Sequence, residues 1–392
     1  MKDARQVSKL RYLTGLSTHF RFAFCLSRLW QALKWRVLEN LTRQMADGQQ
    51  LDAKSIQAAV EALLSETLSP TIKAEFLSAL SQKGETPDEI AGFASALRAR
   101  AILPQVNPSL RLGHILDLVG TGGDQLGTFN ISTTAALVCA AAGVTVAKHG
   151  NRAVTSKSGS ADVLEALGIR IDLKPDQAMR SLEKHQFAFF FAPLFHPAFQ
   201  HVGAARKLCA AQGQRTIFNL LGPLLNPVLP SAMVLGVPRP QWCEPLAKVL
   251  QTLEVRRAMV VCGRIDPSRL PSGTTLPLCL DELSALGDNT IAEFYQCHGL
   301  NVSTSAPEWP ADPQTTLQDL LGGDKHENAE IIRRLLNGQE KGARREAVLL
   351  NAAAGLWVAE KSRSLAEGRE LANDVLNSGL AAKKLKDLTE DH

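Results

Sequence analysis

Residues 117–160 read DLVGTGGDQLGTFNISTTAALVCAAAGVTVAKHGNRAVTSKSGS, and this stretch decides the fold. It continues a short apolar run that begins at residue 114 and is ended by glycine, a pattern typical of a buried strand. Asn130 to Thr133 then favour the start of a helix, and Gly143 suits the position just after its end. The first half of the stretch therefore predicts a strand, a tight glycine turn and a helix.

The second half of the stretch repeats this order. Val144 to Ala147 predict a strand, and Lys148 to Arg152 are expected to leave its end. After a polar loop, residues 161–167 predict a helix that Gly168 ends. The alternation of strands and helices predicts parallel strands in an α/β fold, where ligands bind beyond the carboxyl ends of the strands.

Two glycine-rich loops therefore lie at neighbouring strand ends, with hydroxyl, amide and lysine side chains between them. Backbone N–H groups in glycine turns and at helix N-termini bind phosphate oxygens, and glycine allows close approach to the main chain. A single such turn can be purely geometric, but the pair predicts a site for a large, multiply charged phosphate ligand. The GxGxxG and GxxxxGK[ST] patterns are absent, so a dinucleotide or a nucleoside triphosphate is not the first expectation.

Composition agrees with a soluble enzyme. The 392 residues suggest two domains, and an apolar content of 45% is ample for a core. No apolar run has the length of a membrane span. The seven cysteines are scattered without a CxxC pair, which argues against zinc and disulfides and favours a reducing cytoplasm.

Charge is distributed unevenly along the chain. Residues 1–36 hold eight lysines and arginines against one acidic residue, Asp3. Because the whole chain carries +4, the remaining residues carry −3 and give no electrostatic case for nucleic acid binding. The basic extension itself could be an amphipathic surface helix or an organellar leader. We favour the simpler interpretations, a floppy appendage or a start codon placed too far upstream.

The rest of the chain predicts two domains. Residues 37–105 have apolar residues at helical spacing and predict a small helical domain, in which Thr86 caps a helix with Pro87 at its first position. A short polar and proline link precedes an α/β domain over residues 109–392. Further strands of this domain are expected at residues 187–191, 232–237 and 258–261, and a surface loop at residues 301–318.

Residues 117–168 resemble the anthranilate phosphoribosyltransferases, whose motifs read DxVGTGGD, TFNxST and KHGNRxxSSxSGSADxLEALG. Later stretches are similar to further family motifs, namely FAPLFHP at 191–197, RTIFNLLGPLLNP at 215–227, GGD at 322–324 and LLNAAA at 349–354. The resemblance begins near residue 37 and continues to the end of the chain. It implies a helical domain joined to a mostly parallel α/β domain, the nucleoside phosphorylase/phosphoribosyltransferase-like fold, and a homodimer formed through the helical domain.

The implied reaction, of the type used in tryptophan biosynthesis, is ribosyl transfer. The amine of anthranilate, or of a related aromatic acid, attacks C1 of phosphoribosyl pyrophosphate, and pyrophosphate leaves. Mg²⁺ bridging the phosphates stabilises charge on the leaving group. An aniline-type amine is neutral and nucleophilic at neutral pH, so positioning can supply much of the rate and no catalytic acid or base is assigned.

The resemblance also assigns residues. Those expected to contact phosphoribosyl pyrophosphate are Gly120, Thr121, Gly123, Asp124, Thr128, Asn130, Ser132, Thr133, Lys148 and Ser160. Those expected at the aromatic acid are Gly120, His149, Asn151, His196, Arg206, Gly222 and Pro223. The guanidinium of Arg206 is a natural partner for a carboxylate because it can donate to both oxygens. Ser132 and Asp266 are the expected magnesium ligands.

Two departures from the family pattern leave an alternative open. The segment 207–214 is three residues longer than the usual spacing. The adjacent Asp-Glu pair expected for magnesium reads Asp266-Pro267, which predicts weak activity or a high magnesium requirement, and Asp281-Glu282 further on is not assigned to the metal. The alternative is a catalytically weakened relative of the same fold that binds a ligand or nucleic acid.

Overall fold

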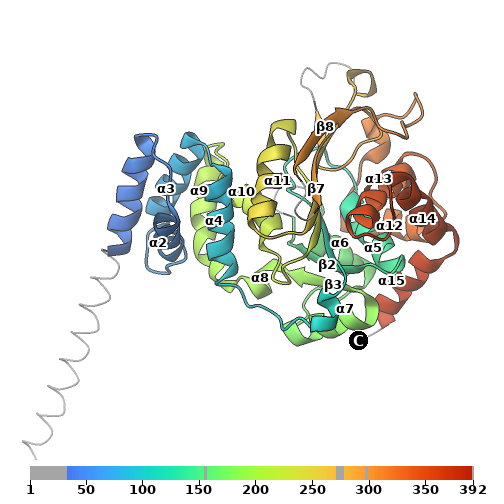
Figure 1. Cartoon of the computed structure of the whole chain (residues 1–392), viewed down its shortest axis with the longest axis horizontal. Helices are drawn as coiled ribbons and strands as arrows, with labels where there is room; N and C mark the ends of the chain where they lie inside the picture. Colours follow the sequence, from blue (N-terminus) through green and yellow to red (C-terminus); the bar gives the residue numbers. More distant parts are fainter. Residues whose placement is uncertain (1–32, 154–156, 271–277, 296–298, 391–392) are drawn as a thin grey trace, which may run out of the picture. The chain divides into compact units, whose positions relative to one another are not determined.

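The computed structural model describes residues 33–153, 157–270, 278–295 and 299–390 (Figure 1). Its contacts divide the chain into two compact units. Unit 1 takes in the residues up to Glu85 together with Ala198–Ile217, and unit 2 takes in Thr86–Pro197 and the residues from Phe218 onward. The predicted N-terminal extension, residues 1–36, lies almost entirely outside the described residues.

Unit 1 is helical. It contains a helix over residues 33–46, α2 (Ala53–Leu63), α3 (Pro70–Lys83) and α9 (Gln200–Ala211). The Asp52 side chain caps α2 by accepting from Ser55 N, and the buried face of α2 has the predicted helical spacing. Lys73 of α3 is buried, and its ammonium group donates to the carbonyl oxygens of Ser65 at 2.6 Å and His201 at 2.7 Å. These bonds join α3 to α9, which is distant in sequence.

Unit 2 begins with α4 (Pro87–Arg98). Thr86 caps this helix in a capping box with Glu89, and Pro87 is its first residue, as the sequence predicts. Within unit 2, α4 packs against α11 (Cys243–Thr252). The last helix of the predicted helical domain thus shares a compact unit with the α/β residues, and the domain boundaries at 36, 105 and 109 stay a prediction.

A mostly parallel sheet forms the centre of unit 2. Its strand order is β3-β2-β1-β4-β5-β7-β8, and β6 pairs with β5. The parallel strands are β1 (Ile115–Gly120), β2 (Thr145–Gly150), β3 (Phe187–Phe191), β4 (Ala232–Gly236) and β5 (Arg257–Arg264). The antiparallel strands are β6 (Cys279–Leu280), β7 (Asn289–Tyr295) and β8 (Asn301–Ser305). This architecture confirms the predicted fold class.

Helices cover both faces of this sheet. In Figure 1, α11 lies on one face, and α5 and α13 lie on the other. The longer helices not yet given are α5 (Ile131–Ala141), α6 (Ser160–Leu167), α7 (Pro175–His185), α12 (Lys325–Leu336), α13 (Ala343–Val358), α14 (Leu365–Asn377) and α15 (Leu380–Glu390). Shorter turns are α8 (Ala192–Phe195), α10 (Phe218–Leu221), η1 (Pro108–Arg111), η2 (Pro197–Phe199), η3 (Gly222–Leu225), η4 (Pro240–Trp242), η5 (Pro267–Arg269) and η6 (Leu317–Leu320).

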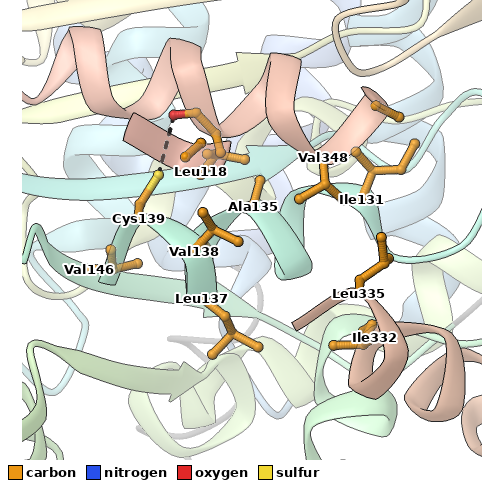
Figure 2. Packing of buried hydrophobic residues seen from close by; sticks show 14 of the residues in the cluster. Leu118, Ile131, Ala135, Leu137, Val138, Cys139, Val146, Ile332, Leu335 and Val348 are labelled. Carbon is orange, nitrogen blue, oxygen red and sulfur yellow. Dashed lines mark hydrogen bonds between the residues drawn. The ribbon is translucent and has the colours of Figure 1, made fainter. Parts of the chain in front are cut away.

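The main core lies between the sheet and the helices of the α5 face. In Figure 2, Val138 and Cys139 of α5 belong to the same buried cluster as Leu118 of β1 and Val348 of α13. The Cys139 thiol donates to the carbonyl oxygen of Ala352 at 3.5 Å, which is the dashed line in the figure. Cys139 therefore packs as a small apolar residue inside a helix, as predicted. No helix in the described part of the chain is long and apolar enough to cross a bilayer.

Two expectations about local structure are wrong. Lys148 and His149 do not leave the end of their strand, because β2 continues to Gly150 and both side chains are buried. Residues 301–305 of the predicted surface loop form β8, an exposed edge strand. The ladder to β7 and a 3.0 Å hydrogen bond between the hydroxyls of Thr290 and Thr304 hold this strand without an apolar face.

Candidate active site

A returning segment covers the carboxyl ends of β1 and β4. Strand β6 runs antiparallel to the end of β5 and brings Asp281 against Gly120 and Gly236, the last residues of β1 and β4. A Cβ at Gly120 would lie 2.6 Å from Asp281 Oδ2, and a Cβ at Gly236 would overlap the Asp281 carbonyl group. Only glycine at both strand ends allows the segment to approach this closely.

This segment places two carboxylates in the predicted phosphate loops. Gly122 N–H donates to Asp281 Oδ2 at 2.5 Å, and Ser132 N–H donates to Glu282 Oε1 at 3.0 Å. Asp281 N–H in turn lies 3.5 Å from Asp124 Oδ2. The glycine turn, the start of α5 and three carboxylates thus meet at one edge of the sheet.

The electrostatics of this edge favour a bound cation. Burial, followed by the charges of Asp124 and Glu282, raises the pKa of Asp281 well above its usual range. Burial raises the pKa of Glu282 to about 7, against the opposing effect of Lys148. The Lys148 ammonium group is itself buried and donates to the Leu118 carbonyl at 2.6 Å. Its single positive charge cannot balance several buried carboxyl groups, so these groups hold protons unless a further cation binds them.

These residues fit Mg²⁺. The structure described contains no group of three or more carboxylate, imidazole or thiolate side chains arranged to hold a metal. Mg²⁺ does not need one, because it usually keeps several waters and uses one or two carboxylates together with substrate phosphates. Asp281 and Glu282 would hold the ion beside the expected ligand Ser132. The two neighbouring carboxyl groups of Asp281 and Glu282, rather than a complete set of protein ligands, indicate the cation.

The structure offers Asp281 and Glu282 as metal carboxylates besides the expected Asp266, whose role stays a prediction. Asp266 is exposed, and its Oδ1 accepts from the Ser268 backbone N–H at 2.8 Å and the Ser268 hydroxyl at 2.7 Å. It therefore serves as the cap of η5, which Pro267 begins. The substitution to proline removes nothing from the glycine turn, because Asp281 and Glu282 already lie there. The only sequence signal for this pair was its adjacency, and pairing of β6 with β5 was needed to place it.

Other predicted phosphate contacts lie around the same edge. Thr121 N–H donates to the Gly236 carbonyl at 3.0 Å, which ties the glycine turn to β4. Asn130 Nδ2 donates to the Ser158 carbonyl at 3.2 Å, and its Oδ1 accepts from Asn328. The remaining members occupy the following places: Thr128 bridges Leu321, Thr133 is buried in α5, Gly123 contacts Pro238, and Ser160 begins α6 beside Gly150. The structure thus brings these residues to one region, and their contacts with a ligand stay a prediction.

Two predicted acceptor residues form a buried histidine pair. The rings of His149 and His196 lie 5.5 Å apart, edge to face. His196 Nε2 lies 2.8 Å from the Leu225 carbonyl, and His149 bonds the backbone of Gly222. Burial, reinforced by His196, lowers the pKa of His149 to about 3, and burial lowers the pKa of His196. Both imidazoles are therefore neutral at pH 7, next to the 222–225 turn that also holds Pro223.

The other acceptor residues are placed less directly. Asn151 follows β2 and accepts from the Arg152 N–H at 2.8 Å. Arg152 is fixed by ion pairs to Asp162 and Glu165 of α6. Arg206 lies on α9 in the other compact unit, and its role toward an aromatic acid stays a prediction.

A parallel sheet whose edge is lined by glycines and favours a cation is typical of proteins that bind phosphorylated ligands. Known protein families match this chain. The α/β domain of a glycosyl transferase family matches residues 112–382, and the helical bundle domain of that family matches residues 39–101. The anthranilate phosphoribosyltransferase of Methanosphaerula palustris is 43% identical over 354 residues, which is 90% of this chain and 97% of the relative.

Solved structures agree. The crystal structure of anthranilate phosphoribosyltransferase from Thermus thermophilus has a TM-score of 0.76 at 41% identity, covering 89% of this chain and 98% of that one. The enzyme from Saccharomyces cerevisiae in complex with PRPP and Mg also has a TM-score of 0.76, at 26% identity, covering 90% and 97%. The chain belongs to the anthranilate phosphoribosyltransferase family.

Proposed function

We propose that this protein transfers a phosphoribosyl group from phosphoribosyl pyrophosphate to the amine of anthranilate or a related aromatic acid, with Mg²⁺. The observation that carries the proposal is the edge where Asp281 and Glu282 meet the glycine turn and the start of α5. Acidic side chains beside phosphate-binding N–H groups are expected where a divalent cation binds together with the phosphates.

The phosphate side of the reaction uses backbone groups. We expect the Gly120–Asp124 turn and the α5 start to bind the pyrophosphate and hold C1 of the ribose toward the acceptor, once Asp281 and Glu282 leave the Gly122 and Ser132 N–H groups to bind Mg²⁺. When bound by Asp281, Glu282 and Ser132, Mg²⁺ supplies positive charge that stabilises the leaving pyrophosphate. Lys148 balances the buried carboxylates from beneath the turn, since its ammonium group interacts with both Asp117 and Glu282.

The residues on the acceptor side position the aromatic acid and do not transfer a proton. Neutral His149 and His196 next to the 222–225 turn give an aromatic, uncharged wall on which a flat ring can lie. Asn151 and Arg206 are the proposed polar contacts, with Arg206 binding the carboxylate. Because the attacking aromatic amine is already neutral, this side needs no strong base.

The alternative of a weakened relative loses one of its two supports, because Asp266 serves as a local cap while the buried pair is present. The longer segment 207–214 remains its other support. A homodimer formed through the helical domain, and a cytoplasmic location, remain part of the proposal. Exposed apolar side chains of the first helix, Leu33 and Trp35, support the dimer. Sedimentation velocity tests it, and a monomer at working concentrations would reject it.

The test is a fluorescence assay that follows anthranilate consumption with phosphoribosyl pyrophosphate and Mg²⁺. We expect turnover that stops when the metal is chelated and returns when Mg²⁺ is added in excess. Omission of phosphoribosyl pyrophosphate is the control. A folded protein that binds phosphoribosyl pyrophosphate by calorimetry but consumes neither anthranilate nor a substituted anthranilate would refute the acceptor assignment.

A further inference from the structure

A pocket lies at the opposite edge of the unit 2 sheet, where the strands begin. Ser231 and Arg256 on its wall directly precede β4 and β5, and Arg111 in η1 leads toward β1. The pocket has a volume of about 660 Å³, and every residue that lines it belongs to unit 2. It is therefore separated from the carboxylate-lined edge by the length of the strands.

Three arginines line this pocket, and its acidic residue is Glu254. Arg111 donates to the carbonyl oxygens of Leu229 at 2.8 Å and Val228 at 2.6 Å, and Arg256 donates to the Gly113 carbonyl at 2.8 Å. Burial, followed by the charge of Arg256, lowers the pKa of Arg111. Both guanidinium groups are exposed on the pocket wall, where solvent screens their repulsion and the Glu360 carboxylate offsets part of the charge of Arg256. An anion that binds both would gain two charged hydrogen-bond donors.

The third arginine, Arg98 at the end of α4, has unused hydrogen-bonding capacity. Its Nε donates to the Leu224 carbonyl at 2.6 Å, and its Nη2 is buried without a hydrogen-bond partner in the described structure. None of the ion pairs among the described residues joins Arg98, Arg111 or Arg256 to a carboxylate. Because Nη2 is buried, Arg98 contributes its positive charge to the pocket wall rather than a hydrogen bond to a ligand.

The rim of the pocket is apolar. Leu103 is 51% exposed and Leu229 is 39% exposed, although both are large aliphatic side chains. Leu229 also has a φ of 54°, in the left-handed region that a branched residue rarely adopts. The backbone there is held by the Arg111 bond to its carbonyl. A ligand that matches both parts of the wall carries an apolar body next to its charged group.

We propose that this pocket is a binding site for a small organic anion, a carboxylate or a phosphate attached to an apolar body, with the charged group between Arg111 and Arg256. Arg98 joins the pocket to the histidine side of the sheet, because it bonds Leu224 in the same turn whose Leu225 carbonyl contacts His196. Occupation of the pocket is therefore expected to change binding of the acceptor. This coupling rests on the proposed function, whereas binding of the anion does not.

Calorimetry with phenyl phosphate, benzoate and inorganic phosphate tests the site, in the presence of saturating Mg²⁺ and pyrophosphate to fill the phosphate loops. The variant is R111A/R256A, and the matched control is Arg363→Ala, an exposed arginine on the α14 side of unit 2. Loss of charged hydrogen bonds predicts binding that is about 10-fold or more weaker in R111A/R256A and unchanged in Arg363→Ala. Phenyl phosphate against benzoate separates a phosphate ligand from a carboxylate, and inorganic phosphate reports the contribution of the apolar body.

Equal binding of every probe to R111A/R256A and to the unaltered protein would overturn the site. If R111A/R256A does not fold, as judged by circular dichroism, Arg256→Gln removes the charge but keeps a polar side chain and must still weaken binding. The coupling predicts that the bound probe changes the Michaelis constant for anthranilate in the unaltered protein and not in R111A/R256A. A probe that binds without this change overturns the coupling. A protein without any turnover overturns the proposed function and leaves the calorimetric result to decide the site.

Discussion

Glu282→Gln is the sharpest test of the phosphate-loop edge. The change keeps the size of the side chain and an oxygen that can accept from Ser132 N–H, now 3.0 Å from Glu282 Oε1. It removes one negative charge from the place where a cation is expected. Loss of a charged partner typically costs about 1.5–3 kcal/mol, so the Mg²⁺ concentration for half-maximal rate should rise roughly 10- to 150-fold.

The assay is a magnesium titration of anthranilate consumption at saturating phosphoribosyl pyrophosphate. Asp266→Asn is the matched control, because it also removes one carboxylate charge but at the exposed cap of η5. We expect its magnesium requirement to stay unchanged. The reverse result, a large change for Asp266→Asn and none for Glu282→Gln, would refute the placement of the metal on the buried pair.

Four further predictions test the proposed site. The pKa of Glu282 is raised to about 7, so the proton that it holds in the folded protein contributes stability that is present at low pH and lost as pH rises through about 7. Because Mg²⁺ binds the ionised carboxylate, the rise in melting temperature on adding Mg²⁺ should grow from about pH 6 to about pH 8. A rise that stays constant over this range would contradict the assignment of Glu282 to the metal. Gly236→Ala should displace the Asp281 segment and abolish turnover. Gly113→Ala, where a Cβ meets open space, is the control and should do neither. Reaction rates measure the turnover, and circular dichroism checks that each variant folds. Arg206→Ala should raise the Michaelis constant for anthranilate by roughly 10- to 150-fold, and an unchanged constant would place the carboxylate elsewhere. Lys148→Met should lower the melting temperature and weaken phosphoribosyl pyrophosphate binding, because removing one partner of a buried charge pair costs about 3–5 kcal/mol. Unchanged binding by calorimetry would show that this lysine is dispensable.

Local patterns predicted much of the fold. The order of strands and helices over residues 117–168, the capping box of Thr86 and Glu89, and the apolar run of β3 each depend on neighbouring residues, and the structure confirms them. Strand β8 was missed because nothing in its polar, exposed residues has strand periodicity. It exists through its ladder to β7, which is a contact between segments that local sequence does not specify.

In the candidate site, too, features set by local sequence were predictable and features set by contacts between distant segments were not. Glycine turns and the helix start at Ser132 were visible, because such residues have local backbone requirements. The role of Asp281 and Glu282 was not visible, because it depends on a return of the chain across 159 residues to Gly122. The burial of Lys148 was equally hidden, since a lysine inside a strand is tolerated only when carbonyl and carboxylate partners meet it there.

The bonds from Gly122 and Ser132 to Asp281 and Glu282 have a consequence for selectivity. The N–H groups best placed for phosphate already bind carboxyl groups that the chain supplies itself. A bare phosphate must displace these tethered carboxyl groups, whereas a phosphate that arrives as its magnesium complex converts them into metal ligands. The side chains of Asp281 and Glu282 are thereby expected to discriminate between free inorganic phosphate and the metal-chelated diphosphate of the substrate.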